Sequence, residues 1–280
     1  MDRDERPSTR GAVKPLRPIL RWAGGKQKLT PALLRVLPAD YYRLVEPMAG
    51  SAALFFACGA KQAILGDSNS ELIDFYRVLA SRSDDLIVRL LRLKASRRRY
   101  YEFRESRPRS ELDRAVRFAY LNRLCWNGLY RVNRQGEFNV PIGSRLPSKL
   151  WDGNHLRCAA AMLRNAEFVC ADFELTLRSC KPGDVVYLDP PYPKTTRDSV
   201  GFNRYTPAPF SAADHERLAR AAIRAHKRGV RMIVSTGSSE AFVSLFPRDF
   251  RVIRVTSSSL IACNGSARGP VRETILRNYD

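Results

Sequence analysis

The chain is organised around one stretch, Val185-Val186-Tyr187-Leu188-Asp189-Pro190-Pro191-Tyr192. Its four apolar residues, with β-branched and aromatic side chains, predict a short buried strand. Pro190 ends that strand, because proline has no N–H to donate to a central ladder. Asp189 is therefore expected at the carboxyl end of a strand, where open α/β sheets bind ligands. The alternative is a buried strand followed by an ordinary proline turn.

Segments on both sides of this stretch alternate between strand and helix patterns. Two short strands end in acids, at Glu46 and at Asp67, and residues 167–173 form a third that ends in Asp172-Phe173. The remaining expected helices are residues 27–37, 71–79, 156–163 and 211–227, and the remaining strands are residues 230–235, 251–256 and 274–277. This alternation predicts a doubly wound α/β sheet.

Two turns rich in small residues precede the second strand. The first is Trp22-Ala23-Gly24-Gly25-Lys26, and the second is Glu46-Pro47-Met48-Ala49-Gly50-Ser51-Ala52. Small residues let a ligand approach the backbone and a helix N-terminus. Asp67 follows Glu46 at about the spacing at which nucleoside-binding α/β folds place an acid against the ribose hydroxyls. The alternative for Asp67 is a helix N-cap.

Composition narrows the class of protein. Among 280 residues, 48 Lys and Arg stand against 28 Asp and Glu, which gives a net charge of +20 and a pI near 10.2. This excess favours a polyanionic partner, nucleic acid first, over a generally basic soluble protein. The sequence contains no apolar run of membrane-spanning length and no signal-peptide core near its start. The six cysteines and three histidines fit no metal or disulfide pattern, so we expect reduced thiols, a cytoplasmic location and no metal.

The alternation is interrupted by a basic block. Residues 82–149 hold 17 Lys and Arg against 7 Asp and Glu. The patterns predict helices at residues 84–109 and 111–126, and then a hairpin at residues 127–141 with Gln135-Gly136 at its turn. A basic hairpin with aromatic residues at its base is suited to a DNA groove. The alternative is a solvated insertion.

Together these segments resemble the Dam-type family of DNA adenine-N6 methyltransferases, in the D12 class and alpha order. Residues 22–26, 46–52 and 67–69 resemble its cofactor motifs, and 189–192 resembles its catalytic D-P-P-Y. Residues 122–131 and 136–141 are similar to its recognition hairpin, and 264–268 to its C-terminal loop. Two positions depart from the family pattern: Ala52 stands where glycine is usual, and Trp126 where an intercalating tyrosine is common.

The resemblance implies a Rossmann-like methyltransferase sheet with an inserted, mainly helical target-recognition domain that carries a β-hairpin. The methyltransferase domain would comprise residues 15–80 and 153–280, and the recognition domain residues 81–152. Residues 1–14 are expected to be a disordered basic tail. The protein would be monomeric when free.

The resemblance also implies roles for individual residues. A flipped adenine in double-stranded DNA, within GATC, would receive a methyl group from S-adenosyl-L-methionine. Catalysis would rest on Asp189, Pro190 and Tyr192. The cofactor would contact Trp22, Lys26, Glu46, Gly50, Asp67, Asp172, Phe173 and Asp189. DNA would contact Arg21, Trp126, Asn127, Leu129, Arg131 and Pro141.

Other functions remain alternatives at this point. One group is methylation of cytosine N4, of RNA or of a protein glutamine; the related glutamine enzymes usually carry Asn, and the cytosine enzymes Ser, in place of Asp189. A second is a DNA-binding protein without catalysis. The intact tetrad from Asp189 to Tyr192 argues against it, since binding alone does not need those residues.

Overall fold

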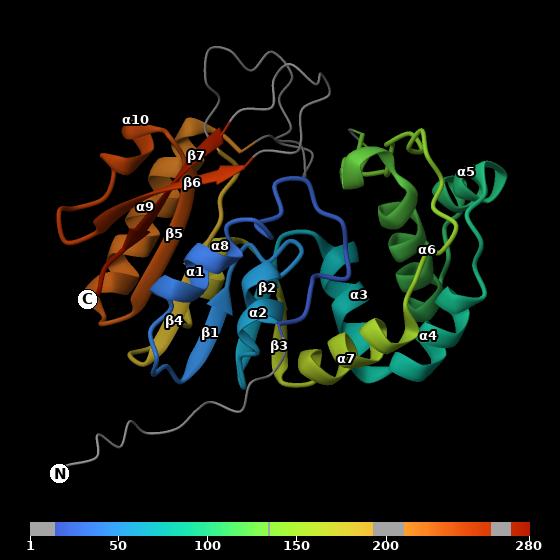
Figure 1. The fold of residues 1–280 in the computed structure, drawn as a ribbon, viewed down its shortest axis with the longest axis horizontal. Helices are drawn as coiled ribbons and strands as arrows, with labels where there is room; N and C mark the ends of the chain where they lie inside the picture. Colours follow the sequence, from blue (N-terminus) through green and yellow to red (C-terminus); the bar gives the residue numbers. More distant parts are fainter. Residues whose placement is uncertain (1–14, 134, 193–209, 259–269) are drawn as a thin grey trace, which may run out of the picture.

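The computed structural model describes residues 15–133, 135–192, 210–258 and 270–280, and in them one seven-stranded sheet forms the centre of the fold (Figure 1). The strands are β1 (Arg43–Glu46), β2 (Ala63–Asp67), β3 (Ala166–Cys170), β4 (Asp184–Leu188), β5 (Arg231–Gly237), β6 (Arg251–Ser258) and β7 (Pro270–Arg277). Their order across the sheet is β3-β2-β1-β4-β5-β7-β6. Neighbours among β1 to β5 run parallel, whereas β7 lies antiparallel to both β5 and β6.

Strand β4 shows why the sheet is covered on both faces. Val185 and Tyr187 belong to one core cluster, and Val186 and Leu188 belong to another. Successive side chains of a strand point to opposite faces, so a run of apolar residues without alternation fits a strand buried on both sides. All five residues of β4 are buried. The expected α/β sheet with two covered faces is confirmed.

Helices form the two covering layers. The first core cluster holds residues of α1 (Thr30–Val36), α2 (Ala53–Cys58), α3 (Ser70–Ser81) and α7 (Gly153–Leu163). The second holds residues of α8 (Phe173–Arg178), α9 (Ala212–Lys227) and α10 (Glu240–Val243). Two predicted bounds were wrong. Helix α1 begins at Thr30 rather than 27, and β3 ends at Cys170 rather than 173, because Asp172 already caps α8 by accepting from the Glu174 N–H.

The basic block is mainly helical and lies beside the sheet rather than within it (Figure 1). Its helices are α4 (Ser83–Leu91), α5 (Arg97–Glu105) and α6 (Glu111–Leu124). The predicted single helix over residues 84–109 was wrong. It is interrupted because Ser96 caps α5, and the Tyr120 hydroxyl of α6 accepts from the Ser96 N–H and donates to the Lys94 carbonyl.

The predicted hairpin over residues 127–141 is less regular than expected. The helix before it ends at Leu124, because Cys125 is extended, and a 3-10 turn, η1 (Trp126–Gly128), follows. In place of two strands there are isolated bridges between Cys125 and Ile142 and between Val132 and Phe138. The turn lies near the predicted place, since Gly136 has a φ of 78° and donates to the Asn133 carbonyl. We call residues 125–142 the recognition loop, after the role that the resemblance predicts for them.

Two predicted segments lie outside the described residues: the tail 1–14 and the C-terminal loop 264–268. Among the residues that are described, no helix is long and apolar enough to cross a membrane.

Candidate functional site

Asp189 sits directly after β4, and two side chains from distant segments hold its carboxylate. Lys26 Nζ lies 2.8 Å from Asp189 Oδ1, and the Ser235 hydroxyl of β5 donates to the same oxygen at 2.8 Å. Lys26 is itself oriented by donating to the Gly24 carbonyl at 2.7 Å. Tyr187 lies with its hydroxyl 3.0 Å from Ser235 Oγ. An ion pair and a hydrogen bond to the same oxygen hold the carboxylate in one orientation.

Tyr192 ends the tetrad and is held from three sides. Its hydroxyl donates to Glu273 Oε1 of β7 at 3.1 Å, and Lys26 Nζ lies 4.5 Å from the ring centroid. A Cβ at Gly237 would come within 3.1 Å of the Tyr192 ring, so the end of β5 leaves room for it. Burial, and then the Asp189 charge, raise the pKa of Tyr192 far above its usual value. The neutral ring is thus fixed beside the carboxylate.

The glycine-rich turn between β1 and α2 is shaped around an indole. Gly50 has a φ of 47°, and a Cβ there would lie 2.9 Å from Trp22. The buried Tyr76 hydroxyl donates to the Gly50 carbonyl at 2.8 Å. Ala52 adopts a φ of 51° and so occupies the left-handed region that favours glycine. This left-handed backbone explains why glycine is usual at this position.

Glu46 ends β1 and is only 2% exposed. Its Oε1 accepts from the Phe55 N–H at 2.7 Å, inside the first turn of α2. Burial raises the pKa of Glu46 to about 8; the Phe55 N–H opposes this shift and the nearby Asp189 charge adds to it. The carboxyl therefore holds its proton at neutral pH, ready to ionise if a cation is bound beside it.

Asp67 ends β2 and accepts from two backbone N–H groups, Gly50 at 3.0 Å and Asn69 at 2.9 Å. The cap of α3 is Asn69, whose side chain accepts from the Leu72 N–H, so the helix-cap alternative for Asp67 was wrong. Burial raises the pKa of Asp67, and its N–H partners oppose that shift. A carboxylate has room for about four hydrogen bonds, which leaves acceptor capacity for hydroxyl groups.

Asp172 and Phe173 stand at the start of α8, beyond β3. Arg217 of α9 donates to both oxygens of Asp172, at 2.8 and 2.9 Å, and its guanidinium lies 4.3 Å from the Phe173 ring centroid. Phe173 is buried, and Asp172 is exposed. The pair lies along the same end of the sheet as Asp67, because β2 and β3 are parallel with Asp67 opposite Cys170.

The recognition loop is tied to the turn that carries Trp22. The Asn122 side chain of α6 accepts from the Arg21 N–H at 3.0 Å and donates to the Arg21 carbonyl at 2.7 Å. A Cβ at Gly128 would come within 2.6 Å of Arg21 Cβ, so this glycine permits close contact. Trp22 stacks on Tyr130 with ring centroids 5.9 Å apart. The exposed Arg21 thus lies next to the loop, as the DNA-contact prediction requires.

The predicted DNA-contact residues of the loop differ in exposure. Trp126, Asn127 and Pro141 are exposed, and Asn127 has a left-handed φ of 52°. Leu129 is only 9% exposed and packs into the core, so it offers little surface to a base. Arg131 is half-buried, and its Nε donates to Asn139 Oδ1 at 2.8 Å.

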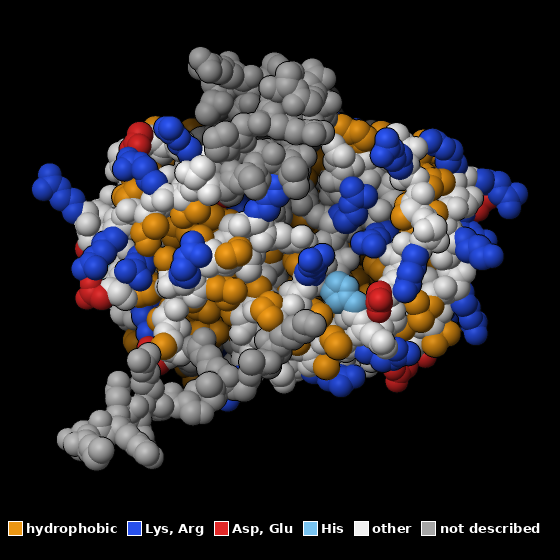
Figure 2. Space-filling model, in the orientation of Figure 1, with side chains coloured by type: hydrophobic (Ala, Val, Ile, Leu, Met, Phe, Trp, Pro, Cys, Tyr) orange, Lys and Arg blue, Asp and Glu red, His pale blue; other side chains and the backbone are white. Residues whose placement is uncertain are grey.

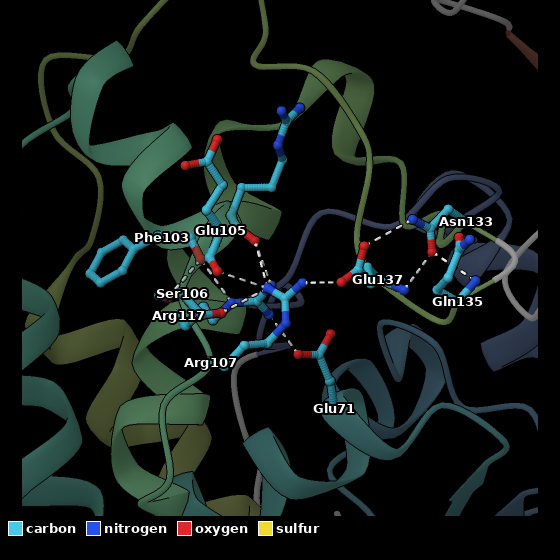
Figure 3. A network of polar contacts seen from close by, with 10 residues as sticks. Glu71, Phe103, Glu105, Ser106, Arg107, Arg117, Asn133, Gln135 and Glu137 are labelled. Carbon is cyan, nitrogen blue, oxygen red and sulfur yellow. Dashed lines mark hydrogen bonds and ion pairs between the residues drawn. The ribbon is translucent and has the colours of Figure 1, made fainter.

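A network of polar contacts underlies the loop (Figure 3). Arg117 of α6 donates to Glu71 Oε1 of α3 at 2.7 Å and to the Phe103 carbonyl at 2.8 Å. The Tyr130 hydroxyl donates to the other oxygen of Glu71, also at 2.7 Å. Arg107 pairs with Glu137 at the far end of the loop. The network holds the recognition loop at two points, Tyr130 from Glu71 of α3 and Glu137 from Arg107.

Lys and Arg side chains are spread over the face of the molecule shown in Figure 2, over the sheet side and over the helical side. Among the ion pairs of the described residues, the most exposed cation is Arg98 on α5. Its side chain is 89% exposed, and its partner Glu102 lies at 3.4 Å. Such a face attracts polyanions.

Comparison with known proteins decides the family. Residues 22–259 match the model of the D12 class N6 adenine-specific DNA methyltransferases. The chain belongs to this family. It is therefore an adenine-specific DNA methyltransferase, and the span of the match includes the Trp22 turn, the tetrad from Asp189 to Tyr192 and the recognition loop.

Similar proteins span the methyltransferase over nearly its whole length. The chain is 34% identical to the type II methyltransferase M1.LlaDCHI of Lactococcus lactis. That match covers 94% of this chain and 96% of the relative. It is 32% identical to the DNA adenine methylase of Escherichia coli K12, over 94% of this chain and 95% of the relative. It is 31% identical to the type II methyltransferase M.MjaIII of Methanocaldococcus jannaschii, over 94% and 99%.

Sequence reasoning missed several residues of this methyltransferase site. They are the partners that fold the site together, namely Ser235, Gly237, Glu273 and Glu71. Each lies far along the chain from the residue it holds, and no motif near it indicates the contact. Lys26, which the resemblance places against the cofactor, forms an ion pair with Asp189 in the structure.

Proposed function

We propose that this methyltransferase transfers a methyl group from S-adenosyl-L-methionine to N6 of an adenine flipped out of double-stranded DNA, within GATC. One observation carries the proposal. The Asp189 carboxylate, gripped by Lys26 and Ser235, lies beside the neutral ring of Tyr192 at the end of a central strand.

The reacting group sets the demand on these residues. The adenine amino group is a poor nucleophile, because its lone pair is delocalised into the ring. The Asp189 carboxylate and the Pro190 carbonyl would each accept one amino hydrogen, which directs the lone pair toward the methyl donor. Tyr192 would stack on the flipped ring. Positioning of this kind is the main source of catalysis in an in-line displacement.

The cofactor residues fit a nucleoside with a charged tail. S-adenosyl-L-methionine supplies a methyl group on a sulfonium that an amine can attack. Asp67 keeps acceptor capacity for ribose hydroxyls beside its two N–H partners. Gly50 packs directly against the Trp22 indole, where a Cβ would lie only 2.9 Å from the ring. Glu46 would ionise near a bound cation, while Asp172 and Phe173 would border the adenine.

We assign target recognition to residues 81–152 and the methyltransferase domain to residues 15–80 and 153–280. Two features support this division: the helices of the first segment lie beside the sheet, and that segment is strongly basic. Trp126 would fill the space left by the flipped base, and Arg131 would read a guanine, whose O6 and N7 suit a guanidinium. The exposed Pro141 is a better candidate than the buried Leu129 for contact with a thymine methyl.

The alternatives are other methyl acceptors. Asp189 stands where the related glutamine enzymes usually carry Asn and the cytosine-N4 enzymes Ser, and the basic recognition loop fits duplex DNA. Relatives named DNA adenine methylase support adenine as the methyl acceptor.

The test is methyl transfer from radiolabelled S-adenosyl-L-methionine to duplex oligonucleotides that differ in one base pair, followed by mapping of the modified base. Label at adenine N6 in GATC is the expected result. Efficient methylation of duplexes without GATC would overturn the target, and label on cytosine, RNA or protein would overturn the acceptor.

A further inference from the structure

The tetrad at the end of β4 has little backbone freedom of its own. The rings of Pro190 and Pro191 fix their φ angles near −65°. Asp189 and Pro190 each precede a proline, which restricts both to extended ψ values. The dihedral that remains open is ψ of Pro191, and it decides the plane of the Pro191 carbonyl and the direction in which Tyr192 leaves the turn. Whatever holds the Pro191 carbonyl completes the geometry of the site.

His215 in the first turn of α9 holds that carbonyl. Its Nε2 lies 2.7 Å from the Pro191 oxygen, and its Nδ1 lies 2.9 Å from the Ser211 oxygen. Carbonyl oxygens only accept, and a neutral imidazole carries one N–H, so the ring can donate to only one of these two oxygens. The nearer of the two contacts is the one to the tetrad. The side chain is 6% exposed, so water does not compete for the bond.

The ring itself has little room to move. Phe210 meets it edge-on with centroids 4.8 Å apart, and Phe242 of α10 does so at 5.3 Å. The helix start that carries it is also rigid, because Ser211 and Asp214 form a reciprocal capping box. The contact therefore ties the tetrad to a fixed point on a long helix.

We infer that His215 is a positioning residue for methyl transfer: by donating to the Pro191 carbonyl, it holds the turn so that Asp189, the Pro190 carbonyl and Tyr192 converge on the amino group. The inference rests on the proposed chemistry of the tetrad. His215 touches neither the adenine nor the cofactor in this assignment. Its effect should appear in the rate of the chemical step and leave ligand binding unchanged.

The variant that tests this is His215→Phe, which keeps an aromatic ring between Phe210 and Phe242 but removes the donor. We expect kcat to fall about tenfold, the size of effect that loss of one hydrogen bond produces at a reacting geometry. The dissociation constants for S-adenosyl-L-methionine and duplex DNA should stay within about twofold, because no ligand contact is lost. His215→Gln, whose amide can donate, should recover part of kcat.

The matched control is His226→Phe. His226 lies on the same helix, meets Phe250 edge-on and pairs with Asp249, but it is not in contact with the tetrad. Thermal melting of all three variants shows whether each is folded at the assay temperature. His226→Phe is expected to keep kcat.

Two results would overturn the role of His215. One is a folded His215→Phe protein with kcat within twofold of the starting enzyme. The other is a loss of activity in His215→Phe that does not come from the lost donor. Such a loss would appear only as weaker ligand binding, or as a fall in kcat that His215→Gln fails to relieve. Failure of the proposed chemistry is separate, since it would appear as retained methyl transfer in Asp189→Ala.

Discussion

Two regions of the molecule are built in opposite ways: the end of the sheet that carries Asp189, and the recognition loop. At the sheet, Asp189 and Tyr192 each have several partners. Side chains from β5, β7 and the Trp22 turn bind them through an ion pair, hydrogen bonds and a contact between Lys26 and the Tyr192 ring. In the recognition loop, Tyr130 and Glu137 are anchored by Glu71 and Arg107, while Trp126 and Asn127 stay exposed. Chemistry requires preorganised groups, whereas reading DNA requires exposed ones on a fixed backbone.

The comparison predicts different kinds of loss in the two regions. Substitutions at the sheet should change rate or cofactor binding on every DNA sequence. Substitutions in the loop should change which sequence is chosen. The following four predictions test this division, starting with the largest effect.

Asp189→Ala should lower kcat by 10²-fold or more, roughly the cost of losing one positioned group. The fold should survive, because Asp189 lies after β4 and contributes no core packing. The measurement is single-turnover methyl transfer, with circular dichroism as a check on folding. Asp152→Ala, which removes the exposed cap of α7, is the control and should keep its rate. More than about a tenth of the starting rate in Asp189→Ala would contradict the role of the carboxylate.

Asp67→Ala should weaken S-adenosyl-L-methionine binding by about 1.5–3 kcal/mol for each hydrogen bond to the charged group that is lost. Isothermal titration calorimetry gives the dissociation constant directly. Asp67→Asn is the matched variant, because its oxygen can still accept from the Asn69 N–H. An unchanged affinity in Asp67→Ala would mean that the carboxylate serves only the Gly50 and Asn69 N–H groups.

Arg131→Ala should relax discrimination at one guanine by about 1–3 kcal/mol. The measurement is kcat/KM on duplexes substituted one base pair at a time. Arg98→Ala, at an exposed site on α5, should weaken binding evenly across sequences and reduce its salt dependence. An equal loss on matched and mismatched sites for Arg131→Ala would remove that residue from base reading and blur the division between the regions.

Glu46→Gln should flatten the pH dependence of stability. The native state keeps the Glu46 proton up to about pH 8, whereas the unfolded chain releases it near its usual pKa of 4.5. The free energy of unfolding should therefore fall as pH rises through this window, by up to about 1.4 kcal/mol per pH unit. Glutamine keeps the acceptor for the Phe55 N–H but does not titrate.

Urea unfolding at pH 5.5 and pH 8 measures this slope. Glu137→Gln on the recognition loop is the control. Bonds from Asn133, and then Arg107, lower the pKa of Glu137, so it titrates below this window and its substitution should leave the slope unchanged. The same slope in Glu46→Gln and in the starting protein would show that Glu46 is ionised when the protein is free.

Local patterns predicted most of the sheet but not the regularity of the basic block. The run Val185 to Leu188 predicts a buried strand, because a short apolar run and the proline that ends it are local signals. The break between α4 and α5 depends on Tyr120, whose hydroxyl bonds both sides of it from another helix. The recognition loop follows a similar rule: its alternation suggests two strands, but only isolated bridges form, and Glu71 and Arg107 from outside the loop hold the Tyr130 and Glu137 side chains.

The sequence by itself determined the family resemblance, the order of the α/β elements, the acids that end β1 and β2 and the acid that follows β4. These are properties of short stretches, where residue type and spacing act within one element. Only the tertiary structure decided that Lys26 and Ser235 share one oxygen of Asp189, that Glu273 holds Tyr192, and that His215 reaches the Pro191 carbonyl. The physical reason is distance along the chain: such contacts form only after parallel strands bring their carboxyl ends to one edge, and no local pattern encodes them.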